Sequence, residues 1–376
     1  MRGELVHDVE RAGEISKAWD DLAVECQRPY CAPAWLLAWW RHVRPPGAEF
    51  RLALVFDGSD LVGVAPFFIS PTPSRMRPYR VLGAATIVRV EPCAQRGRER
   101  EVAAVFADLL ASASPRVTSL DFQGIPATSS WPLLLSDGWP GHRRPSRHIR
   151  ARTPAPTLAL EGRTYAEWFA SRSPNFRQQM RRARRQLEGH GAQFRIAKKG
   201  RELELGLNAF TVLHRQRWEA RGGSSVLTRG VDRMLWDAGR ALARDERLRL
   251  WTIEIEGRPI SSQIFLAAGG EVSYWLGGFD ETWAASKPAL VTLLAAIEDA
   301  FARGDRRFDL GAGGQDYKYR FADAEESLIT ATLVPAGVTN WPARVSVSGR
   351  AARDRITSQM TPEQKQLVKK LLRRSP

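Results

Sequence analysis

Hydrophobic and polar residues follow one another along this chain in patterns that switch repeatedly between helical and strand spacing. In the first third, two stretches of helical spacing precede two strand-like stretches around Asp57-Gly58-Ser59, a sequence typical of a tight turn. A further helical stretch and a short strand come next. The predicted elements are helices at Ile15–Leu22, Pro33–His42 and Val102–Leu110 and strands at Arg51–Phe56, Leu61–Ile69 and Val117–Phe122.

The second half of the chain repeats this order of elements. In each half, the helix after the hairpin leads to a strand with an acidic residue, Asp121 in the first and Asp309 in the second. We interpret the pattern as a duplicated helix-helix-hairpin-strand-helix-strand unit, the alternative being a chance likeness between two α/β segments. The elements of the second half are predicted at Phe210–Arg221, Val231–Arg244, Leu248–Ile255, Ile260–Ala267, Val272–Phe279, Ala289–Ala302 and Arg307–Leu310.

The pattern predicts an α/β (α+β) protein of two lobes, each a mixed, mainly antiparallel sheet flanked by helices. The stretch Arg143–Pro156 is rich in arginine, proline and serine and lacks apolar periodicity, so we expect a linker there. The lobes then cover residues 1–150 and 151–335, and residues 336–376 form a basic connector and a last helix. Thr361-Pro362 is predicted to start that helix, which docks on the protein itself or makes a weak membrane-surface contact.

The chain of 376 residues is strongly basic, since 56 Lys and Arg against 41 Asp and Glu give a net charge of +15. Such a charge points to an anionic partner: a phosphate-bearing ligand, nucleic acid or a lipid surface. The basic residues are scattered and accompany no recognisable nucleic-acid-binding module, so nucleic acid is not favoured, although a tRNA-linked substrate stays open. No apolar run has the length of a membrane span or a signal sequence, and we expect a cytoplasmic protein.

The sequence lacks the motifs of several common kinds of site. Cys26, Cys31 and Cys93 have no C-x-x-C spacing and the six histidines lie far apart, so we expect neither a disulfide framework nor a metal site. The cysteines are interpreted as small core residues or inert surface thiols. The P-loop, the dinucleotide-binding glycine pattern and the serine-hydrolase elbow are also missing from the sequence.

The sharpest charge feature is a basic helix. Ser173 is predicted to cap this helix, Pro174 to start it and Gly189 to end it. Guanidinium groups at helical spacing suit phosphates or carboxylates, and a solvated basic face is the alternative. The arginines of the expected exposed stripe are Arg177, Arg181, Arg184 and Arg185, of which Arg177 and Arg181 are candidates for substrate binding.

The end of the repeated unit is the second feature. A strand is predicted to deliver Asp309 to its carboxyl end, where ligands tend to bind in open α/β sheets. A glycine-rich turn at Gly311–Gly314 allows close approach of the backbone, and Lys318 follows shortly after it. The alternative is a plain turn with Lys318 in solvent.

A third feature is the helical segment that contains His214, Arg217 and Trp218, which helical spacing places close together. A histidine near its ordinary pKa could take a proton from an amine or hydroxyl, and Trp218 could form a pocket wall. A purely structural role for His214 is the alternative.

With these residues in place, the sequence resembles the CelD/BcsL-type acetyltransferases associated with cellulose biosynthesis, which belong to the GNAT superfamily and are akin to the Fem peptidyltransferases. The resemblance covers roughly residues 18–334, and its motifs keep the same order. Those motifs are Trp19, Pro33-Ala-Trp35, Leu61-Val-Gly-Val-Ala-Pro66, Asn175-Phe-Arg177, Arg181-Arg182-Ala-Arg184-Arg185-Gln-Leu-Glu188, His214-Arg-Gln-Arg-Trp218, Arg221-Gly222, Gly278-Phe279-Asp280, Phe308-Asp309-Leu310-Gly311 and Tyr317-Lys318.

The resemblance implies two GNAT-like lobes, with acyl-CoA bound mainly by the second and an acceptor in the cleft between them. The aromatic-lysine pair of Fem-like relatives corresponds here to Tyr317-Lys318, which the resemblance makes functionally important. Where standard GNAT enzymes carry a glycine-containing pyrophosphate motif, this chain has Ala285-Ser286-Lys287-Pro288-Ala289. We expect Ser286 to cap the following helix, whose start still offers backbone N–H groups to phosphate.

The expected function is that of an acyl-CoA-dependent N-acyltransferase, acetyl by default, acting on an amine of a small molecule, sugar or peptide without a metal. His214 or Asp309 is expected to deprotonate the acceptor and Lys318 to contact an anionic group, while Gln263 and Ser262 line the acyl or acceptor path. The alternatives are a Fem-like aminoacyl transferase that uses charged tRNA and a non-catalytic scaffold that binds an anionic partner. The full set of expected site residues is His214, Asp309, Tyr317 and Lys318 for catalysis, Gln263, Ser286, Lys287 and Ala289 for acyl-CoA, and Arg177, Arg181, Arg217, Trp218 and Trp275 for substrate.

Overall fold

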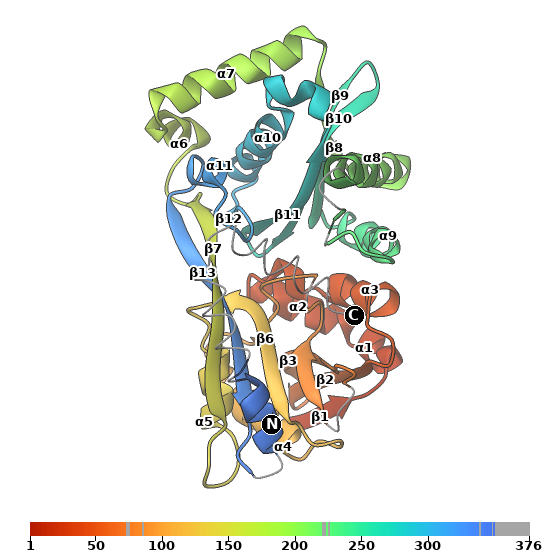
Figure 1. Ribbon diagram of the computed structural model, residues 1–376, viewed down its shortest axis with the longest axis vertical. Helices are drawn as coiled ribbons and strands as arrows, with labels where there is room; N and C mark the ends of the chain where they lie inside the picture. The colour runs from red at the N-terminus through yellow and green to blue at the C-terminus, as the bar shows by residue number, and fades with distance from the viewer. Residues whose placement is uncertain are drawn as a thin grey trace, which may run out of the picture.

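A computed structural model describes residues 1–72, 76–84, 86–219, 223–224, 226–337, 340–347 and 349, and within this part of the chain thirteen strands form one sheet (Figure 1). The strands in sheet order are β1 (Arg2–Val6), β2 (Glu49–Asp57), β3 (Asp60–Ile69), β4 (Pro78–Val81), β6 (Ser119–Pro126), β13 (Ala324–Val334), β7 (Ser146–Ala159), β12 (Arg307–Asp309), β11 (Glu271–Phe279), β10 (Arg258–Ala268), β9 (Leu248–Ile255) and β8 (Gln193–Ala197), with β5 (Cys93–Ala94) beside β3.

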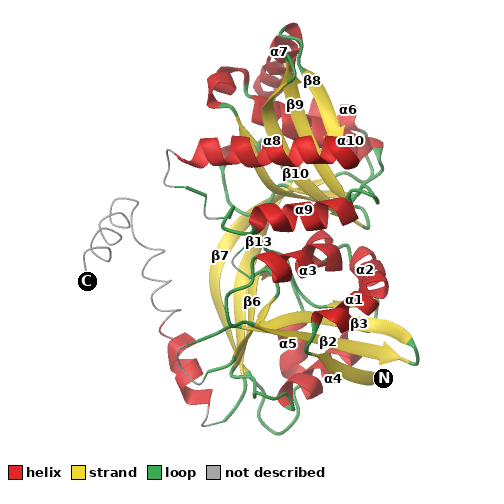
Figure 2. Ribbon diagram, turned by 90° about the vertical axis from the view of Figure 1, so that its right-hand side faces the viewer, coloured by secondary structure: helices red, strands yellow, loops and turns green. Residues whose placement is uncertain are grey.

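Helices cover the two halves of this sheet (Figure 2). The α-helices are α1 (Val9–Glu14), α2 (Ser16–Glu25), α3 (Pro33–His42), α4 (Glu99–Ala111), α5 (Trp131–Asp137), α6 (Tyr165–Ser171), α7 (Pro174–Gly189), α8 (Gly200–Glu219), α9 (Val231–Leu242), α10 (Pro288–Ala302) and α11 (Asp316–Tyr319), and the 3-10 helices are η1 (Pro29–Cys31) and η2 (Glu281–Ser286). None of the helices in the described residues has the length and hydropathy of a membrane span.

The strand pairings of the two half-sheets follow the same pattern, which confirms the predicted duplication. From the outer edge inward, β1, β2, β3 and β4 pair antiparallel, and so do β8, β9, β10 and β11. Next comes one parallel pair in each half, β4 with β6 and β11 with β12. A helix lies between the two parallel strands in the sequence, α4 in the first half and α10 in the second, as a parallel connection requires.

The two central strands exchange places between the lobes. β7 follows the first lobe in sequence but pairs with β12 of the second, whereas β13, the last strand, pairs with β6 of the first. β7 and β13 also pair with each other and run side by side from one lobe to the other in Figure 1. The interpretation of Arg143–Pro156 as a linker is therefore wrong, and the expected boundary at residue 150 falls inside β7.

The composition of β7 explains why its strand character escaped the sequence pattern. A proline has no N–H group to donate and usually interrupts the hydrogen bonds of a strand that has neighbours on both sides. Pro154 and Pro156 nevertheless both lie within β7. Their carbonyls accept hydrogen bonds on the side away from β13, from Gly313 N at 2.7 Å and Leu310 N at 3.0 Å. Since the N–H and C=O of a strand residue point the same way, the missing N–H groups leave the β7–β13 ladder intact.

Most predicted elements are present, with differences at their ends and some additions. The long helix α8 begins at Gly200, ten residues before the predicted Phe210, and α10 begins at Pro288. The elements that the pattern missed are β1, β4, β5, β7, β8, β13, α1, α5, α6, α11, η1 and η2, most of them short or at an edge of the sheet. Residues 341–347 are helical, while the helix predicted from Thr361 lies outside the described residues.

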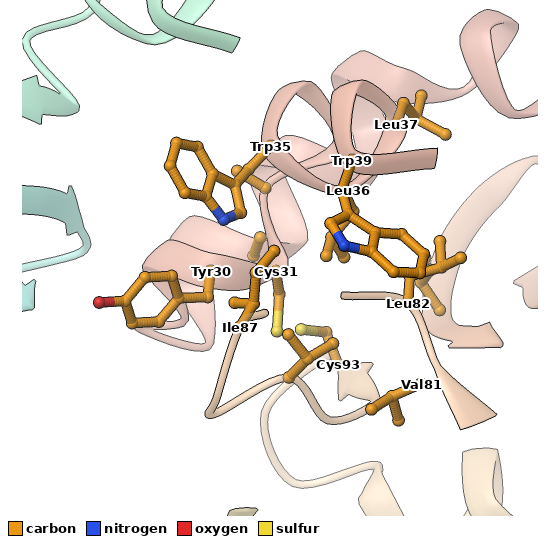
Figure 3. Close-up of a cluster of buried hydrophobic side chains, with 14 of the residues drawn as sticks. Tyr30, Cys31, Trp35, Leu36, Leu37, Trp39, Val81, Leu82, Ile87 and Cys93 are labelled. Carbon is orange, nitrogen blue, oxygen red and sulfur yellow. The ribbon is translucent and has the colours of Figure 1, made fainter. Parts of the chain in front are cut away.

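The lobes are joined by α3 and α9, which pack against each other where the half-sheets meet (Figure 2). The core beside them is rich in tryptophan from α3, and Figure 3 shows Trp35 and Trp39 close to Cys31 and Cys93. Cys31 and Cys93 are buried and Cys26 is partly exposed, all as free thiols.

Candidate active site

The candidate site begins at the point along β11 where its pairing with β12 ends. Of β11, only the first residues, Glu271–Ser273, pair with β12, because β12 ends at Asp309 while β11 continues to Phe279. The residues Tyr274–Phe279 thus form an open edge on the β12 side of β11. Backbone groups on such an edge that have no other partner are available for pairing with another extended chain.

A β-bulge marks the start of this open edge. Ile264 of β10 pairs with Leu276 and Phe265 with Tyr274, so Trp275 is the extra residue of β11. A bulge leaves its extra residue outside the ladder and locally redirects the strand. Trp275 packs edge-on against Trp35 of the first lobe, with ring centroids 5.1 Å apart, and it therefore lies at the lobe interface.

The glycine-rich turn after β12 lies directly against β11. Gly311 has a positive φ of +80°, and a Cβ there would come within 2.9 Å of the Tyr274 carbonyl oxygen. A residue other than glycine would thus be strained and would clash. The same carbonyl oxygen accepts a hydrogen bond of 3.1 Å from the Tyr30 hydroxyl of the first lobe.

Lys318 is buried under this turn rather than exposed to solvent. Its Nζ donates to the carbonyl oxygens of Gly311 at 2.9 Å and Ala312 at 2.8 Å, and only 3% of the residue is exposed. Burial lowers the pKa of Lys318 to about 8, against the opposing effect of nearby Asp309. The alternative of a solvent-exposed Lys318 is wrong.

Asp309 stands at the carboxyl end of β12, as predicted, with its carboxylate oxygens engaged. Arg89 of the first lobe places Nε 2.6 Å from Oδ2 and donates from Nη2 to Oδ1 at 3.0 Å. The Gly311 N–H donates to Oδ1 at 3.1 Å. The buried carboxylate thus holds Arg89 on one side and the glycine turn on the other.

His214 lies between α8 and β11, with both ring nitrogens engaged. Nδ1 is 2.9 Å from the Gly277 carbonyl oxygen and Nε2 is 2.9 Å from the Ser224 hydroxyl. Because a carbonyl only accepts, Nδ1 carries the proton and Nε2 accepts from Ser224. Burial lowers the pKa of His214, which favours this neutral form.

Arg217 and Trp218 follow His214 on α8 but point to different places. The Trp218 ring is 6.1 Å from the His214 ring and is 37% exposed. The Arg217 guanidinium lies 4.4 Å from the centroid of Phe279, at the end of the open edge. Arg217 also lies near the Tyr317 hydroxyl, where its charge partly offsets the rise that burial causes in the pKa of Tyr317.

Gln263 reaches the start of α10 from the neighbouring strand. Its Nε2 donates to the Ala289 carbonyl oxygen at 2.7 Å, whereas its buried Oε1 has no hydrogen-bond partner among the described residues. A Cβ on Gly277 would lie 2.8 Å from both Gln263 Cγ and the Tyr274 hydroxyl, so these groups converge beside the open edge. Ser262 points to the opposite face of the sheet, towards Thr252, and so does not share a path with Gln263.

The start of α10 differs from the prediction. Lys287, not Ser286, is the N-cap residue, with a left-handed φ of +52°, and no side chain caps the helix. Ser286 is buried at the end of η2 because the left-handed turn at Lys287 carries the chain directly into Pro288. A polar cavity of about 520 Å³ lies beside this turn and is lined by Asn175, Gln178, Gln179, Arg182, Ala183, Gln186, Ala285 and Lys287.

Helix α7 supplies most of that lining and begins as predicted, since the Ser173 hydroxyl accepts from Phe176 N at 3.2 Å. Its expected arginine stripe is only partly free. Arg184 pairs with Glu298 at 2.9 Å, and Arg181 lies over the ring of Phe169. Arg177 is half-buried, and Arg181 faces α6 rather than the open edge.

The structure thus brings together Asp309, Tyr317, Lys318, Gln263, Ala289 and Arg217 around the open edge, and it places His214, Trp218 and Trp275 on the α8 side of the sheet. The sequence interpretation missed Tyr30 and Arg89, which reach the site from the first lobe. No local pattern could have found them, since their partners lie more than 200 positions away. Arg182 was missed as well, although it stands within the predicted basic helix beside Lys287.

Comparison with known proteins gives a family match for part of the chain and likenesses of fold. Residues 174–319 match the family model described as Acetyltransferase (GNAT) domain. No curated protein matches the chain. Among solved structures, FemX gives a TM-score of 0.58 at 11% identity over 86% of this chain and 96% of that one. The C-terminal domain of a putative lysylphosphatidylglycerol synthetase from Agrobacterium fabrum gives 0.57 at 10% identity over 91% and 96%.

The chain therefore contains a GNAT acetyltransferase domain within its second lobe and has a GNAT-type acyltransferase fold. The match spans α7 through α11 and so includes Lys287, the open edge of β11 and Lys318. The likeness to FemX extends over both lobes and concerns the fold alone.

Proposed function

We propose that this protein is an acyl-CoA-dependent N-acyltransferase, acetyl by default and of the CelD/BcsL type, and that it works at the open edge of β11. The observation that carries the proposal is that three features lie around the same stretch of β11. These are the uncapped start of α10, the unpaired edge of β11 with its bulge, and the buried Lys318 at the far end.

The phosphates of the donor are proposed to bind beside the start of α10. Backbone N–H groups at a helix start attract phosphate, and Lys287 and Arg182 add positive charge in the cavity of about 520 Å³. The extended pantetheine arm of CoA carries amide groups, which suit pairing with the free edge of β11. This course would bring the thioester to the bulge at Trp275.

In the proposed reaction, the acceptor amine attacks the thioester carbonyl carbon, the C–S bond breaks and the thiolate leaves. Backbone N–H groups released by the bulge would donate to the oxygen as it becomes negative. The amine loses one proton during this attack. Holding both reactants in one groove between the lobes would supply much of the rate enhancement.

Lys318 is the group we propose to accept that proton. A neutral amine has two N–H bonds and a lone pair, and the two carbonyl oxygens of Gly311 and Ala312 match the N–H bonds. The lone pair is then left to take a proton. In contrast, His214 and Asp309 have their polar atoms engaged by Ser224, Gly277, Arg89 and Gly311.

Calorimetric titration with acetyl-CoA, longer acyl-CoAs and free CoA tests the donor. We expect saturable binding to the wild type and binding about tenfold weaker in the double variant Arg182→Ala/Lys287→Ala, because two charge-assisted phosphate contacts are lost. Arg185→Ala, an exposed arginine of the same helix, is the matched control and should bind like the wild type. A wild type that binds none of these compounds contradicts the proposal.

The alternative donor is an aminoacyl-tRNA, for which the net charge of +15 and the exposed arginines of α7 are permissive. Binding of tRNA should weaken steeply as salt rises, because many phosphates are contacted, whereas a CoA ester with few contacts responds less. Tight, salt-sensitive tRNA binding without CoA binding would favour this alternative. Ligand binding with no acyl transfer to any amine would favour a non-catalytic scaffold.

A further inference from the structure

A second cavity, of about 530 Å³, lies in the first lobe. Its walls come from the end of α2, the start of α4, the residues before α5, and two side chains of the second lobe, Arg307 and Glu326. Cavities of roughly 300–1,000 Å³ hold small ligands in many proteins. Nothing in the proposed acyl transfer uses this space.

The duplication relates this cavity to the candidate active site. In the repeated order of elements, α2, α4 and α5 of the first lobe correspond to α8, α10 and α11 of the second. The start of α4 lines this cavity, and it corresponds in that order to the start of α10, which lies beside the proposed donor site.

Ion pairs between buried and half-buried side chains form the floor of the cavity. The Arg28 guanidinium lies 2.6 Å from the fully buried Glu91 carboxylate, which also accepts from the Ser129 hydroxyl. Arg89 and Arg307 both pair with Glu326, at 2.9 and 2.8 Å. Because these charges already satisfy one another, the floor is polar and preformed without an excess of either sign.

At the mouth of the cavity, unlike at its floor, two arginine side chains have no partner among the described residues. Arg96 and Arg100 are exposed, and within the described part of the chain their guanidinium groups make no ion pair or hydrogen bond. The neighbouring carboxylates of Glu25 and Glu99 are turned to backbone N–H groups, those of Arg96 at 3.0 Å and Gly97 at 3.2 Å. The guanidinium groups of Arg96 and Arg100 are therefore free to bind a ligand at the opening of a polar cavity.

The start of α4 also lies at this mouth. The helix is 13 residues long, and its N-cap residue Arg98 makes no side-chain cap. Gly97, just before it, has a φ of +83° and lines the cavity. Helix starts of this kind favour anions.

We propose that this cavity is a second binding site, for a small phosphate-bearing molecule. Its phosphate binds at Arg96 and Arg100, and the rest of the ligand fills the polar space towards Arg28 and Arg89. Bidentate guanidinium contacts favour phosphate over a monovalent anion such as chloride.

The proposed site connects with the candidate active site through one chain of contacts. Arg89 donates to Asp309 at 3.0 Å, Asp309 accepts from Gly311 N at 3.1 Å, and the Gly311 carbonyl oxygen accepts from Lys318 at 2.9 Å. A ligand that contacts Arg89 therefore lies three residues away from Lys318. The two sites face the same buried network from opposite lobes.

Cys26 supplies a reporter for the experiment, since it lines the cavity and is partly exposed while Cys31 and Cys93 are buried. The rate of Cys26 alkylation by iodoacetamide is measured with inorganic phosphate, pyrophosphate or ADP, and with sodium chloride at matched ionic strength. We expect saturable protection by a phosphate compound, at least about fivefold at high concentration, and none by sodium chloride beyond screening. Comparison of the three compounds shows whether phosphate alone or a nucleotide is bound.

The double variant Arg96→Ala/Arg100→Ala should need about tenfold more ligand for the same protection, whereas Arg185→Ala should behave like the wild type. The absence of protection in the wild type at about 10 mM ligand, or equal protection in the double variant, would overturn the proposal. The donor-site variant Arg182→Ala/Lys287→Ala should keep the protection. The fate of this proposal is therefore separate from that of the acyl-CoA site.

Discussion

Lys318 shows how strongly the surroundings of a side chain determine its pKa and its position. A lysine in water is almost wholly protonated at neutral pH, but burial under the Gly311 turn lowers the pKa of Lys318 to about 8. Two backbone carbonyls hold its nitrogen in one position. A base with this pKa and fixed geometry suits proton transfer from an amine near physiological pH.

Replacement of Lys318 tests this role. In Lys318→Met we expect turnover to fall by about 10²–10³-fold while acetyl-CoA binds as in the wild type, because the proton acceptor is lost and the donor contacts remain. The rate of the wild type should rise with pH and level off above about 8, since only the neutral amine accepts a proton. That rise should be missing from the residual activity of the variant, measured as CoA release. Wild-type kinetics in Lys318→Met would remove the assignment.

The raised pKa of Glu271, at the start of β11, leads to a prediction about how stability depends on pH. Burial raises its pKa to about 7, against the opposing charge of Arg307. Between the unfolded pKa near 4.5 and the folded value, the folded protein holds a proton that the unfolded chain releases. The contribution of Glu271 to the free energy of unfolding is therefore greatest below pH 4.5 and is lost as the pH rises through about 7.

The variant Glu271→Gln isolates this contribution, because its amide cannot ionise. The melting temperature of the wild type should fall relative to that of the variant as the pH rises from 5 to 8, and calorimetry at several pH values gives the difference between the two. Parallel melting curves over this range would show that Glu271 titrates normally.

Among the elements, α8 and β11 illustrate how a glycine permits close packing at the site. A Cβ at Gly278 would lie 2.4 Å from the backbone nitrogen of His214, a distance that neither backbone can tolerate. The absence of a side chain therefore lets α8 lie directly on the strand that carries the open edge. His214, hydrogen-bonded to the Gly277 carbonyl oxygen, then locks the helix in place.

We expect Gly278→Ala to destabilise the protein by about 2–4 kcal/mol, because the methyl group forces α8 away from β11. Gly257→Ala is the comparison at a turn where a Cβ would meet nothing within 4 Å, and its smaller cost reflects only its positive φ of +72°. Denaturant unfolding of both variants measures the difference. Equal stability of the two variants would mean that the α8–β11 contact is looser than described.

For the molecule as a whole, the exchange of β7 and β13 makes each lobe depend on the other. β13, from the end of the second lobe, pairs along β6 of the first, and β7 pairs with β12 of the second. Arg89 and Tyr30 add polar contacts across the same interface. Neither half-sheet is complete without a strand from the other half of the sequence.

The full chain should therefore unfold in one cooperative transition despite its two lobes. We expect a single calorimetric peak with equal calorimetric and van't Hoff enthalpies. The Arg89→Met variant, which removes the buried partner of Asp309, should lower the melting temperature without splitting the peak. Two separate transitions in the wild type would show that the central strands do not couple the lobes.

The sequence was sufficient for the features that depend on neighbours in the chain. Helix α7 was predicted with its start at Pro174 and its end at Gly189, because capping and apolar spacing are local properties. The hairpins β2–β3 and β9–β10 were found for the same reason, and their recurrence led to the correct interpretation of a duplication. Asp309 and the glycine turn were placed at the end of a strand by the same kind of pattern.

Local patterns could not predict the pairings between segments that lie far apart in the sequence. The strand β7 looked like a linker because its prolines and arginines break apolar periodicity, and only its place between β13 and β12 makes it a strand. The state of Lys318, the engagement of His214 and Asp309, and the cavity of the first lobe all depend on side chains that folding brings from far away. Local patterns record the conformation of a segment, whereas burial, ion pairing and the pKa of a group follow from what the tertiary structure packs against it.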